Sequence, residues 1–231
     1  MLKKWSALPS CMQVPEVKPY YDALKKKQFS LLCKRIFDLV VAFIMLILVA
    51  LPMLIIAIWI KCDSHGPVFY RQERVTTNGK HFRIHKFRTM VNHADKIGSA
   101  VTVGNDSRIT KVGAKLRDYR LDELPQLLDV LAGDMSFVGT RPEAVKYVEK
   151  YAPEYMATLL LPAGITSEAS IRYKDENKLL DAADDVDAVY LQRVLPDKMK
   201  WNLESIRRFS FWGDIATMFR TVAAVLGKDY N

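Results

Sequence analysis

The chain has 231 residues and a formal net charge of +8, from 34 lysines and arginines against 26 aspartates and glutamates. This length suits one domain, or one domain with appendages, and allows a sizeable buried core. The positive charge favours acidic partners, namely nucleic acid, anionic lipid or a phosphorylated ligand, but does not choose among them. The three cysteines have no CxxC spacing and cannot all pair, so we expect them to be reduced, in a protein that faces the cytosol.

The first 30 residues form a mostly polar N-terminal arm that includes the run Lys25-Lys26-Lys27. A signal peptide would need its apolar stretch much nearer Met1, so the arm is not read as one. Its scattered apolar side chains leave two arrangements open. The arm lies on a membrane surface or against the main domain, or it is loosely held.

Residues 36–60 are almost wholly apolar, and as a helix they are long enough to cross a bilayer core of about 30 Å. Pro52 predicts a bend, because proline removes a helix hydrogen bond and clashes with the preceding turn. Basic residues flank both ends, and cytoplasmic flanks are the positive ones. We therefore predict a re-entrant helix broken at Pro52, with a true span and a buried core helix as alternatives. Asp38 is expected to pair with Lys34 or Arg35 at the lipid headgroups.

Two partly alternating runs, residues 68–75 and 81–87, are separated by Asn78-Gly79. This pattern predicts a β-hairpin, because both central positions of a type I′ turn need φ > 0. Lys86 and Arg88, at the end of the second run, either meet a phosphate or lie on a solvated edge.

The most informative stretch is residues 117–128, where Asp122 and Glu123 stand between arginines and the start of a short helix. Pro125 suits the first turn of that helix. The two carboxylates lie where unpaired backbone N–H groups favour negative charge. Because neighbouring side chains diverge, one carboxylate is expected to attack while the other holds a metal. The alternative is that Asp122 only caps the helix and Glu123 is a solvated acid.

Arginines lie on both sides of this pair in the sequence. Arg108 and Arg117 are natural phosphate clamps, because a guanidinium matches phosphate with two parallel hydrogen bonds. A glycine-punctuated connection after the short helix presents Arg141. From Leu195 onward, aromatic and basic residues predict amphipathic helices that lie in the headgroup layer or pack against the core.

Five motifs, in order and behind the proline-containing apolar helix, resemble the bacterial sugar transferases called monotopic phosphoglycosyl transferases. They are Lys86-Phe87-Arg88-Thr89-Met90, Asp106-Ser107-Arg108-Ile109-Thr110, Leu121-Asp122-Glu123-Leu124-Pro125-Gln126-Leu127, Gly133-Asp134-Met135-Ser136-Phe137-Val138-Gly139-Thr140-Arg141-Pro142 and Pro162-Ala163-Gly164-Ile165-Thr166. The resemblance implies transfer of a sugar 1-phosphate from a nucleotide diphosphate sugar, usually a UDP-sugar, to polyprenyl phosphate. This transfer is the first membrane step in making surface glycans.

The implied fold is α+β and mostly helical, with a small β-hairpin. It comprises an N-terminal arm over residues 1–30, a re-entrant helix-break-helix over 31–61, and a cytosolic phosphoglycosyl transferase domain with C-terminal amphipathic helices over 62–231. The residues that would seat the membrane helix are Lys34, Arg35, Asp38 and Pro52. The protein would lie in the bacterial inner membrane, with its catalytic domain on the cytoplasmic face.

The resemblance also implies roles for individual side chains. Asp122 would be the nucleophile that forms a phosphosugar-aspartyl intermediate, and Glu123 would ligate Mg²⁺ or assist positioning. The substrate-binding residues would be Arg117, Arg141, Arg108, Lys86, Arg88 and Pro142.

The expected partners are therefore a nucleotide diphosphate sugar, polyprenyl phosphate and membrane lipids, with a homo-oligomer left open. A nucleic-acid binder accounts for the net charge but not for the long apolar helix. The alternative function is a catalytically inactive relative, or a non-enzymatic membrane-anchored adaptor of a glycan assembly complex.

Overall fold

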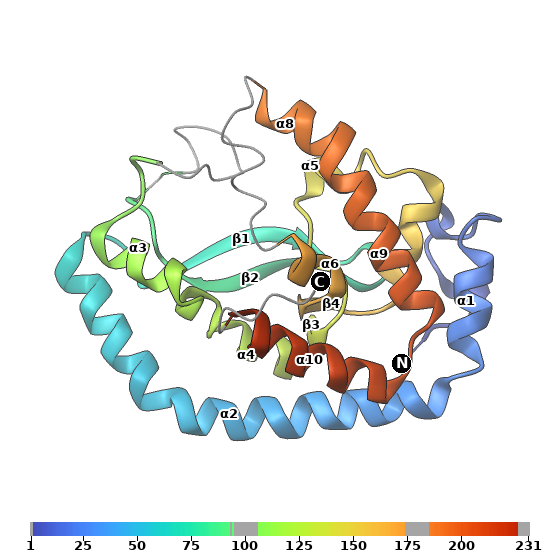
Figure 1. Ribbon diagram of the computed structural model, residues 1–231, viewed down its shortest axis with the longest axis horizontal. Coiled ribbons are helices and arrows are strands. Elements are labelled where there is room, and N and C mark those ends of the chain that lie inside the picture. Colours follow the sequence, from blue (N-terminus) through green and yellow to red (C-terminus); the bar gives the residue numbers. More distant parts are fainter. Residues whose placement is uncertain (1, 93, 95–105, 174–184, 226–231) are drawn as a thin grey trace.

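The computed structural model describes residues 2–92, 94, 106–173 and 185–225. Helices dominate this part of the chain and are accompanied by two-stranded sheets, which confirms the predicted mostly helical α+β class. Helix α2 (Gln28–Asp63) borders the molecule along its longest edge, and most other elements lie on its concave side (Figure 1).

The other α-helices and strands of the described residues, in chain order, are α1 (Lys18–Lys25), β1 (Phe69–Val75), β2 (His81–Phe87), α3 (Lys111–Asp118), α4 (Gln126–Ala132), β3 (Met135–Val138), α5 (Val145–Val148), β4 (Ala163–Thr166), α6 (Glu168–Arg172), α8 (Val186–Val189), α9 (Leu195–Arg207) and α10 (Phe211–Val225). A 3-10 turn, Leu121–Glu123, precedes α4. A π-helical stretch, Tyr190–Val194, joins α8 to α9.

The predicted hairpin is confirmed. Strands β1 and β2 pair antiparallel, from Phe69 opposite Phe87 to Val75 opposite His81. In the connection, Asn78 has φ 57° and the glycine after it has φ 73°, both in the left-handed region that the Asn-Gly pair was expected to adopt.

A second, parallel pair of strands was not predicted. Gly133 caps the C-terminus of α4. Its φ of 91° suits a residue without a Cβ, and its N–H donates to the carbonyls of Asp129 and Val130 in the last helical turn. The chain then enters β3, which pairs with β4 so that Ser136 lies opposite Gly164. A Cβ on Gly164 would stand 2.2 Å from the nitrogen of Gly139, so only glycine allows this approach.

Helix α2 is continuous through Pro52, and its ribbon bends in the C-terminal half (Figure 1). The predicted break is therefore a bend within one helix, because the hydrogen bonds on either side of the proline persist. Among the described helices, α2 is the one long and apolar enough to cross a membrane. Its large apolar side chains are mostly exposed, with Leu48 at 72%, which excludes a buried core helix. The re-entrant course stays a prediction.

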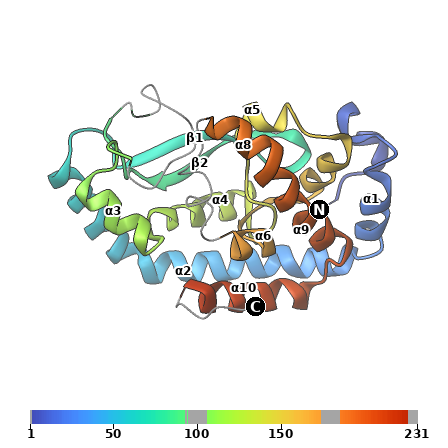
Figure 2. The same cartoon turned by 45° about the horizontal axis from the view of Figure 1, so that its top comes forward.

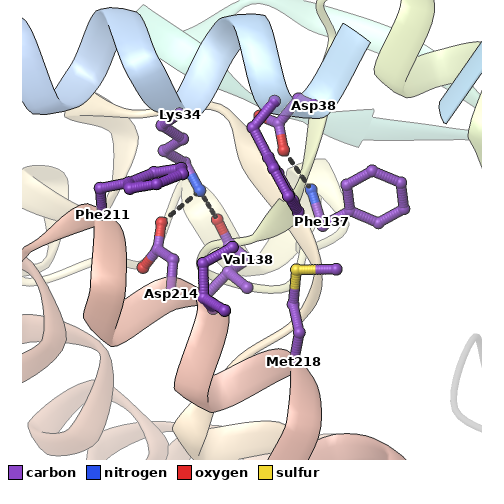
Figure 3. Close-up of a pocket in the computed structure, with 9 residues that line it drawn as sticks. Lys34, Asp38, Phe137, Val138, Phe211, Asp214 and Met218 are labelled. Carbon is purple, nitrogen blue, oxygen red and sulfur yellow. Dashed lines mark hydrogen bonds and ion pairs between the residues drawn. The ribbon is translucent and has the colours of Figure 1, made fainter. Parts of the chain in front are cut away.

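The N-terminal part of α2 is fixed to the rest of the protein by charged side chains (Figure 3). Lys34 Nζ lies 2.7 Å from the carbonyl oxygen of Val138 and 2.5 Å from Oδ2 of Asp214 in α10. The Asp38 carboxylate accepts a hydrogen bond from the N–H of Phe137 at 3.3 Å. These contacts join α2 to β3 and α10.

Arg35 completes this attachment at the end of α4. Its guanidinium donates to the carbonyls of Val130 at 2.7 Å and Leu131 at 3.2 Å, where the helix dipole favours a cation. Lys34 and Arg35 make their hydrogen bonds with these other partners, but both positive charges also act on the Asp38 carboxylate, so the pairing of Asp38 with either of them at the headgroups stays a prediction. All three charged side chains attach the N-terminal part of α2 to the rest of the domain. Their predicted role in seating the helix in the membrane stays a prediction.

The N-terminal arm packs against the domain rather than being loosely held. Met12, Val17 and Leu24 are fully buried in a core cluster that also contains residues of α9. The two C-terminal helices differ from each other. Helix α9 buries Met199 in that core, whereas α10 lies along α2 and exposes Trp212 and other apolar side chains (Figure 2).

Candidate active site

Three separate segments bring charged side chains together around Glu123. Lys86 comes from β2, Glu123 from the 3-10 turn before α4, and Arg141 from the connection after β3. Oε1 of Glu123 lies 2.8 Å from Nζ of Lys86 and 2.5 Å from Nη2 of Arg141, and Oε2 lies 3.4 Å from Nη1 of Arg141. Glu123 is thus held by two cations and is not a solvated acid.

Asp122 lies beside this ion-pair cluster, with 8% of its surface exposed. It does not cap α4, because the N-cap position is Pro125, which has no capping side chain. Within the described part of the chain, no group donates a hydrogen bond to the Asp122 carboxylate. The carboxylate is therefore enclosed, close to positive charge, and free of a fixed donor.

The environments of the two neighbouring carboxyls push their pKa values in opposite directions. Burial raises the pKa of Asp122, and the positive charge of Lys86 opposes this shift without cancelling it. Burial also acts on Glu123, but Arg141 and Lys86 overcome it and hold the pKa of Glu123 well below its usual range. Such a divergence separates roles, since Glu123 stays anionic while Asp122 is the more basic carboxylate.

Arg117 extends the positive surroundings of Asp122. Its Nε donates to Oγ1 of Thr89 at 2.9 Å, which fixes the half-buried guanidinium. Burial lowers the pKa of Arg117, Asp122 opposes that shift, and Arg108 and Arg120 add to it. The guanidinium nevertheless remains charged at neutral pH. Its electrostatic coupling to Asp122 supports the predicted position of Arg117 in the site.

Arg108 lies near Arg117 but is engaged by its own loop. Its Nε and Nη2 donate to the carboxylate of Asp106, at 2.8 Å and 2.6 Å, and Nη1 donates to the carbonyl of Ala94 at 3.0 Å. The bidentate pair orients the arginine. Arg108 therefore stands at the edge of the site, and its predicted contact with phosphate stays a prediction.

Two predicted substrate-binding residues lie outside the charged cluster. Arg88 is buried, and its Nη atoms donate to the carbonyls of Ser64 and His65, at 2.7 Å each, where α2 ends. Its side chain therefore braces the end of α2. The carbonyl of Pro142 accepts a hydrogen bond from Nη1 of Arg74 at 3.3 Å.

The sequence analysis missed a contact that links β2 to α4. The backbone N–H of His85 donates to Oδ2 of Asp129 at 2.9 Å, and Nδ1 lies 2.6 Å from Oδ1. His85 precedes Lys86, and Asp129 lies six residues after Glu123, so the strand and the carboxylate-bearing turn are joined at two adjacent points. No local pattern signals a contact across 44 residues.

The same carboxylates decide whether the site can bind the predicted Mg²⁺ ion. The described residues contain no group of three or more His, Cys, Asp and Glu side chains that could hold a metal by themselves. Magnesium at phosphate-transfer sites usually needs only one or two carboxylates, with substrate phosphates and water completing its octahedron. Glu123 satisfies that requirement as a single carboxylate, and its Oε2 has only the 3.4 Å contact with Arg141, so the residues fit the ion.

Comparison with known proteins assigns the chain to a family. Residues 29–228 match the model of the bacterial sugar transferase family. A UDP-glucose:undecaprenyl-phosphate glucose-1-phosphate transferase of Xanthomonas campestris pv. campestris is 38% identical over 76% of this chain and 35% of its own length. A UDP-N-acetylgalactosamine-undecaprenyl-phosphate N-acetylgalactosaminephosphotransferase of Aeromonas hydrophila is 35% identical, over 75% of this chain and 38% of its own length.

The chain thus spans little more than a third of those two relatives. A third relative has a more similar length, the exopolysaccharide production protein PSS of Rhizobium leguminosarum bv. phaseoli. It is 37% identical over 76% of this chain and 86% of its own length. The family match covers all the charged residues described above, from Lys34 to Asp214. The chain therefore belongs to the bacterial sugar transferase family.

Proposed function

We propose that this protein transfers a sugar 1-phosphate from a nucleotide diphosphate sugar, with UDP as the nucleotide, to polyprenyl phosphate, and so initiates a surface glycan. The observation that carries the proposal is Asp122, a buried carboxylate with a raised pKa that lies among three cations and has no hydrogen-bond donor among the described residues. The names of the two relatives with UDP-sugar and undecaprenyl phosphate substrates support the same chemistry.

In the first step, a carboxylate oxygen of Asp122 attacks the phosphorus that bears the sugar. A new P–O bond forms, the P–O bond to the nucleoside monophosphate breaks, and the monophosphate leaves with that electron pair. The product is a phosphosugar-aspartyl intermediate. The raised pKa favours this step, because a more basic carboxylate is a better nucleophile once it is ionised.

An anion that attacks a diphosphate needs positive charge close to the reacting atoms. Lys86 and Arg141 provide it from fixed positions, because Glu123 holds both of them. Arg117, which is held by its hydrogen bond to Thr89, provides further positive charge. Glu123 thus has a positioning function in this arrangement, whether or not it also binds metal.

Mg²⁺, when bound to Glu123, would neutralise charge on the diphosphate of the donor. The negative charge of Glu123 is secured by its lowered pKa, so it remains available as a ligand across the physiological pH range. Binding would draw on Oε2, whose contact with Arg141 is the longer one.

In the second step, an oxygen of polyprenyl phosphate attacks the phosphorus of the intermediate. The acyl phosphate bond breaks, and the electron pair returns to the Asp122 carboxylate. The exposed apolar surface of α2 fits this assignment, because a polyprenyl acceptor is confined to a bilayer. We place the protein in the bacterial inner membrane, with a re-entrant α2 and its catalytic domain on the cytoplasmic face.

The test is the release of UMP from a panel of UDP-sugars by detergent-purified protein, with Mg²⁺ and with or without undecaprenyl phosphate. With the correct donor, UMP should appear in a burst of about one equivalent without acceptor, and continuously with acceptor. The intact protein should gain the mass of a sugar phosphate during the burst. Asp122→Asn is the matched control and should give neither burst nor adduct.

Two results would contradict the proposal. An adduct on Asp122→Asn would place the nucleophile elsewhere. Absence of release from every nucleotide sugar, by protein with an intact fold, would favour the inactive or adaptor alternative.

A further inference from the structure

A corner of exposed side chains separates α3 from the catalytic turn. After α3 ends at Asp118, Tyr119 is 73% exposed and Arg120 is also exposed, and the 3-10 turn with Asp122 and Glu123 follows at once. Within the part of the chain that the structure describes, the Arg120 guanidinium makes no hydrogen bond or ion pair. An arginine thus stands two residues from the proposed nucleophile with its donors available.

The backbone at this corner is strained. Arg120 has φ 56° and ψ 21°, a left-handed conformation that costs a residue with a Cβ about 1–2 kcal/mol. The conformation turns the chain, with the N–H of Arg120 bonded to the carbonyl of Arg117 at 3.1 Å. Glycine would make the same turn without strain. The turn therefore does not require an arginine at position 120, and we look for a function of the side chain.

The corner lies beside the C-terminal half of α2. In Figures 1 and 2, α3 runs next to that limb, and Val112 and Leu116 pack against Ile56 and Ile60 of α2. Nζ of the exposed Lys115 stands 5.5 Å from the ring centroid of Trp59.

The composition of this region is that of a membrane boundary. Trp59 is 42% exposed and ends the series of exposed apolar side chains on α2, whereas α3 exposes Lys111 and Lys115. Tryptophan and lysine are characteristic of the headgroup layer. If α2 lies in the bilayer as proposed, the lipid phosphates lie level with α3 and the corner that follows it.

Positive charge continues from the corner to the nucleophile. Arg120 lies near enough to Arg117 for their charges to interact, and Arg117 interacts in turn with Asp122. A lipid phosphate held at Arg120 would therefore meet a second guanidinium on the way to the carboxylate. A phosphate monoester matches this path, because each guanidinium can bind two of its oxygens.

We propose that the exposed Arg120, between the membrane-facing side of α3 and the catalytic turn, binds the phosphate of the polyprenyl phosphate acceptor as it enters the site. This inference rests on the proposed function. It assigns Arg120 to the second step only, because the nucleotide sugar is a soluble donor that does not come from the bilayer.

The two half-reactions separate this role from the rest of the mechanism. Arg120→Gly removes the guanidinium and relieves the backbone strain, so the variant should fold at least as well as the parent protein. It should retain the UMP burst without acceptor and raise the KM for undecaprenyl phosphate about tenfold, the equivalent of one lost charge-assisted hydrogen bond. Arg120→Lys should recover most of this affinity. Arg193→Gln, at an exposed arginine of the π-helical stretch, is the matched control and should change neither quantity.

The source of the phosphate is tested in the same system. Assays in neutral detergent micelles are repeated with phosphatidylglycerol added at increasing fractions. An unchanged KM for undecaprenyl phosphate in Arg120→Gly, together with weaker binding of that variant to phosphatidylglycerol vesicles, would show that Arg120 binds bulk lipid and would overturn the proposal. A lost UMP burst in Arg120→Gly would also overturn it, by placing Arg120 in the first step. A parent protein without any burst would instead refute the proposed function.

Discussion

Two clusters of charged side chains, one at the N-terminal part of α2 and one around Asp122 and Glu123, differ in how fully their charges are paired. At the N-terminal part of α2, every charged group has a defined partner: Lys34 binds Asp214 and the Val138 carbonyl, and Asp38 accepts the Phe137 N–H. In the 3-10 turn Leu121–Glu123, Asp122 is also buried but accepts no hydrogen bond from the described residues. Both clusters pair negative with positive charge in partly buried surroundings.

The difference lies in what each cluster leaves unsatisfied. Buried charges that are fully paired hold elements together, and removing one partner strands the other. A buried carboxylate without a hydrogen-bond donor adds little to the stability of the fold, because its charge is desolvated and only the charges of neighbouring cations compensate it. Perturbed groups of this kind gather at functional sites. The comparison predicts that substitutions at Asp122 affect chemistry, whereas those at Lys34 affect the fold.

The largest expected effect follows from Asp122→Asn. The carboxamide has the same shape but cannot attack phosphorus, so the rate of UMP release should fall by about 10⁴-fold or more. The free energy of unfolding should not decrease, because a buried charge with a raised pKa is removed. Burst kinetics and thermal unfolding of the same preparation measure both. A marked loss of stability would mean that Asp122 is structural, and that the two clusters do not differ in function.

Glu123→Gln should affect both properties, because Glu123 belongs to a paired cluster and also touches the site. Lys86 and Arg141 would lose their counter-charge, and we expect a loss of about 2 kcal/mol, reduced from the fully buried case by the exposure of Arg141. The rate of UMP release should fall by about 10²–10³-fold as the two cations lose their fixed positions. Urea unfolding measures the stability, and the rate constant of the UMP burst measures the chemistry. A variant with full stability would show that Glu123 does not hold the cations in solution.

Lys34→Met should destabilise the protein without changing its chemistry. The variant leaves Asp214 and the Val138 carbonyl without their donor, at a cost of about 3 kcal/mol. The double variant Lys34→Met, Asp214→Leu removes both charges and should recover much of that loss. The burst rate per folded molecule should stay within about twofold of the parent value. A burst that disappears at a temperature where the variant is folded would show that this contact also governs the site.

Local signals account for what the sequence predicted well. Asp122, Glu123 and Pro125 lie within four residues, and the chemistry of a carboxylate pair ahead of a helix follows from that spacing. Asn78-Gly79 needs only its own φ angles to specify a hairpin. The apolar length of α2 and its bend at Pro52 are likewise properties of one segment.

Contacts between distant segments account for what it did not predict. The partner of Glu123, Lys86, is 37 residues away, and Asp129 and His85 are separated by 44. The strands of the parallel pair have four residues each, too few for alternation to mark them. From the sequence, Asp38 could be related only to its neighbours Lys34 and Arg35, whereas β3 and α10 also bind these charges in the folded protein.

The smallest expected effect is a pH dependence that distinguishes the two carboxyls. Asp122 must be ionised to attack, so the burst rate should fall about tenfold per pH unit below its pKa, with a midpoint above the ordinary value of 3.8. Glu123 should not contribute to this limb, because its pKa lies well below 4.5.

The stability effects of the two groups have opposite signs. Because the pKa of Asp122 is raised in the folded protein, Asp122 stabilises the fold below its unfolded-state pKa, and this contribution is lost as the pH rises through its folded-state pKa. Because the pKa of Glu123 is lowered, Glu123 stabilises the fold above its unfolded-state pKa, and this contribution is lost as the pH falls through its folded-state pKa. Burst rates and unfolding free energies measured in parallel between about pH 3 and pH 8 test both signs, because the loss of the Glu123 contribution begins only as the pH falls through the ordinary glutamate value. In Asp122→Asn the contribution that declines with rising pH should vanish and that of Glu123 should remain. An acid limb with its midpoint at or below 3.8 would mean that Asp122 is solvated in solution, and its enclosure could no longer explain its reactivity.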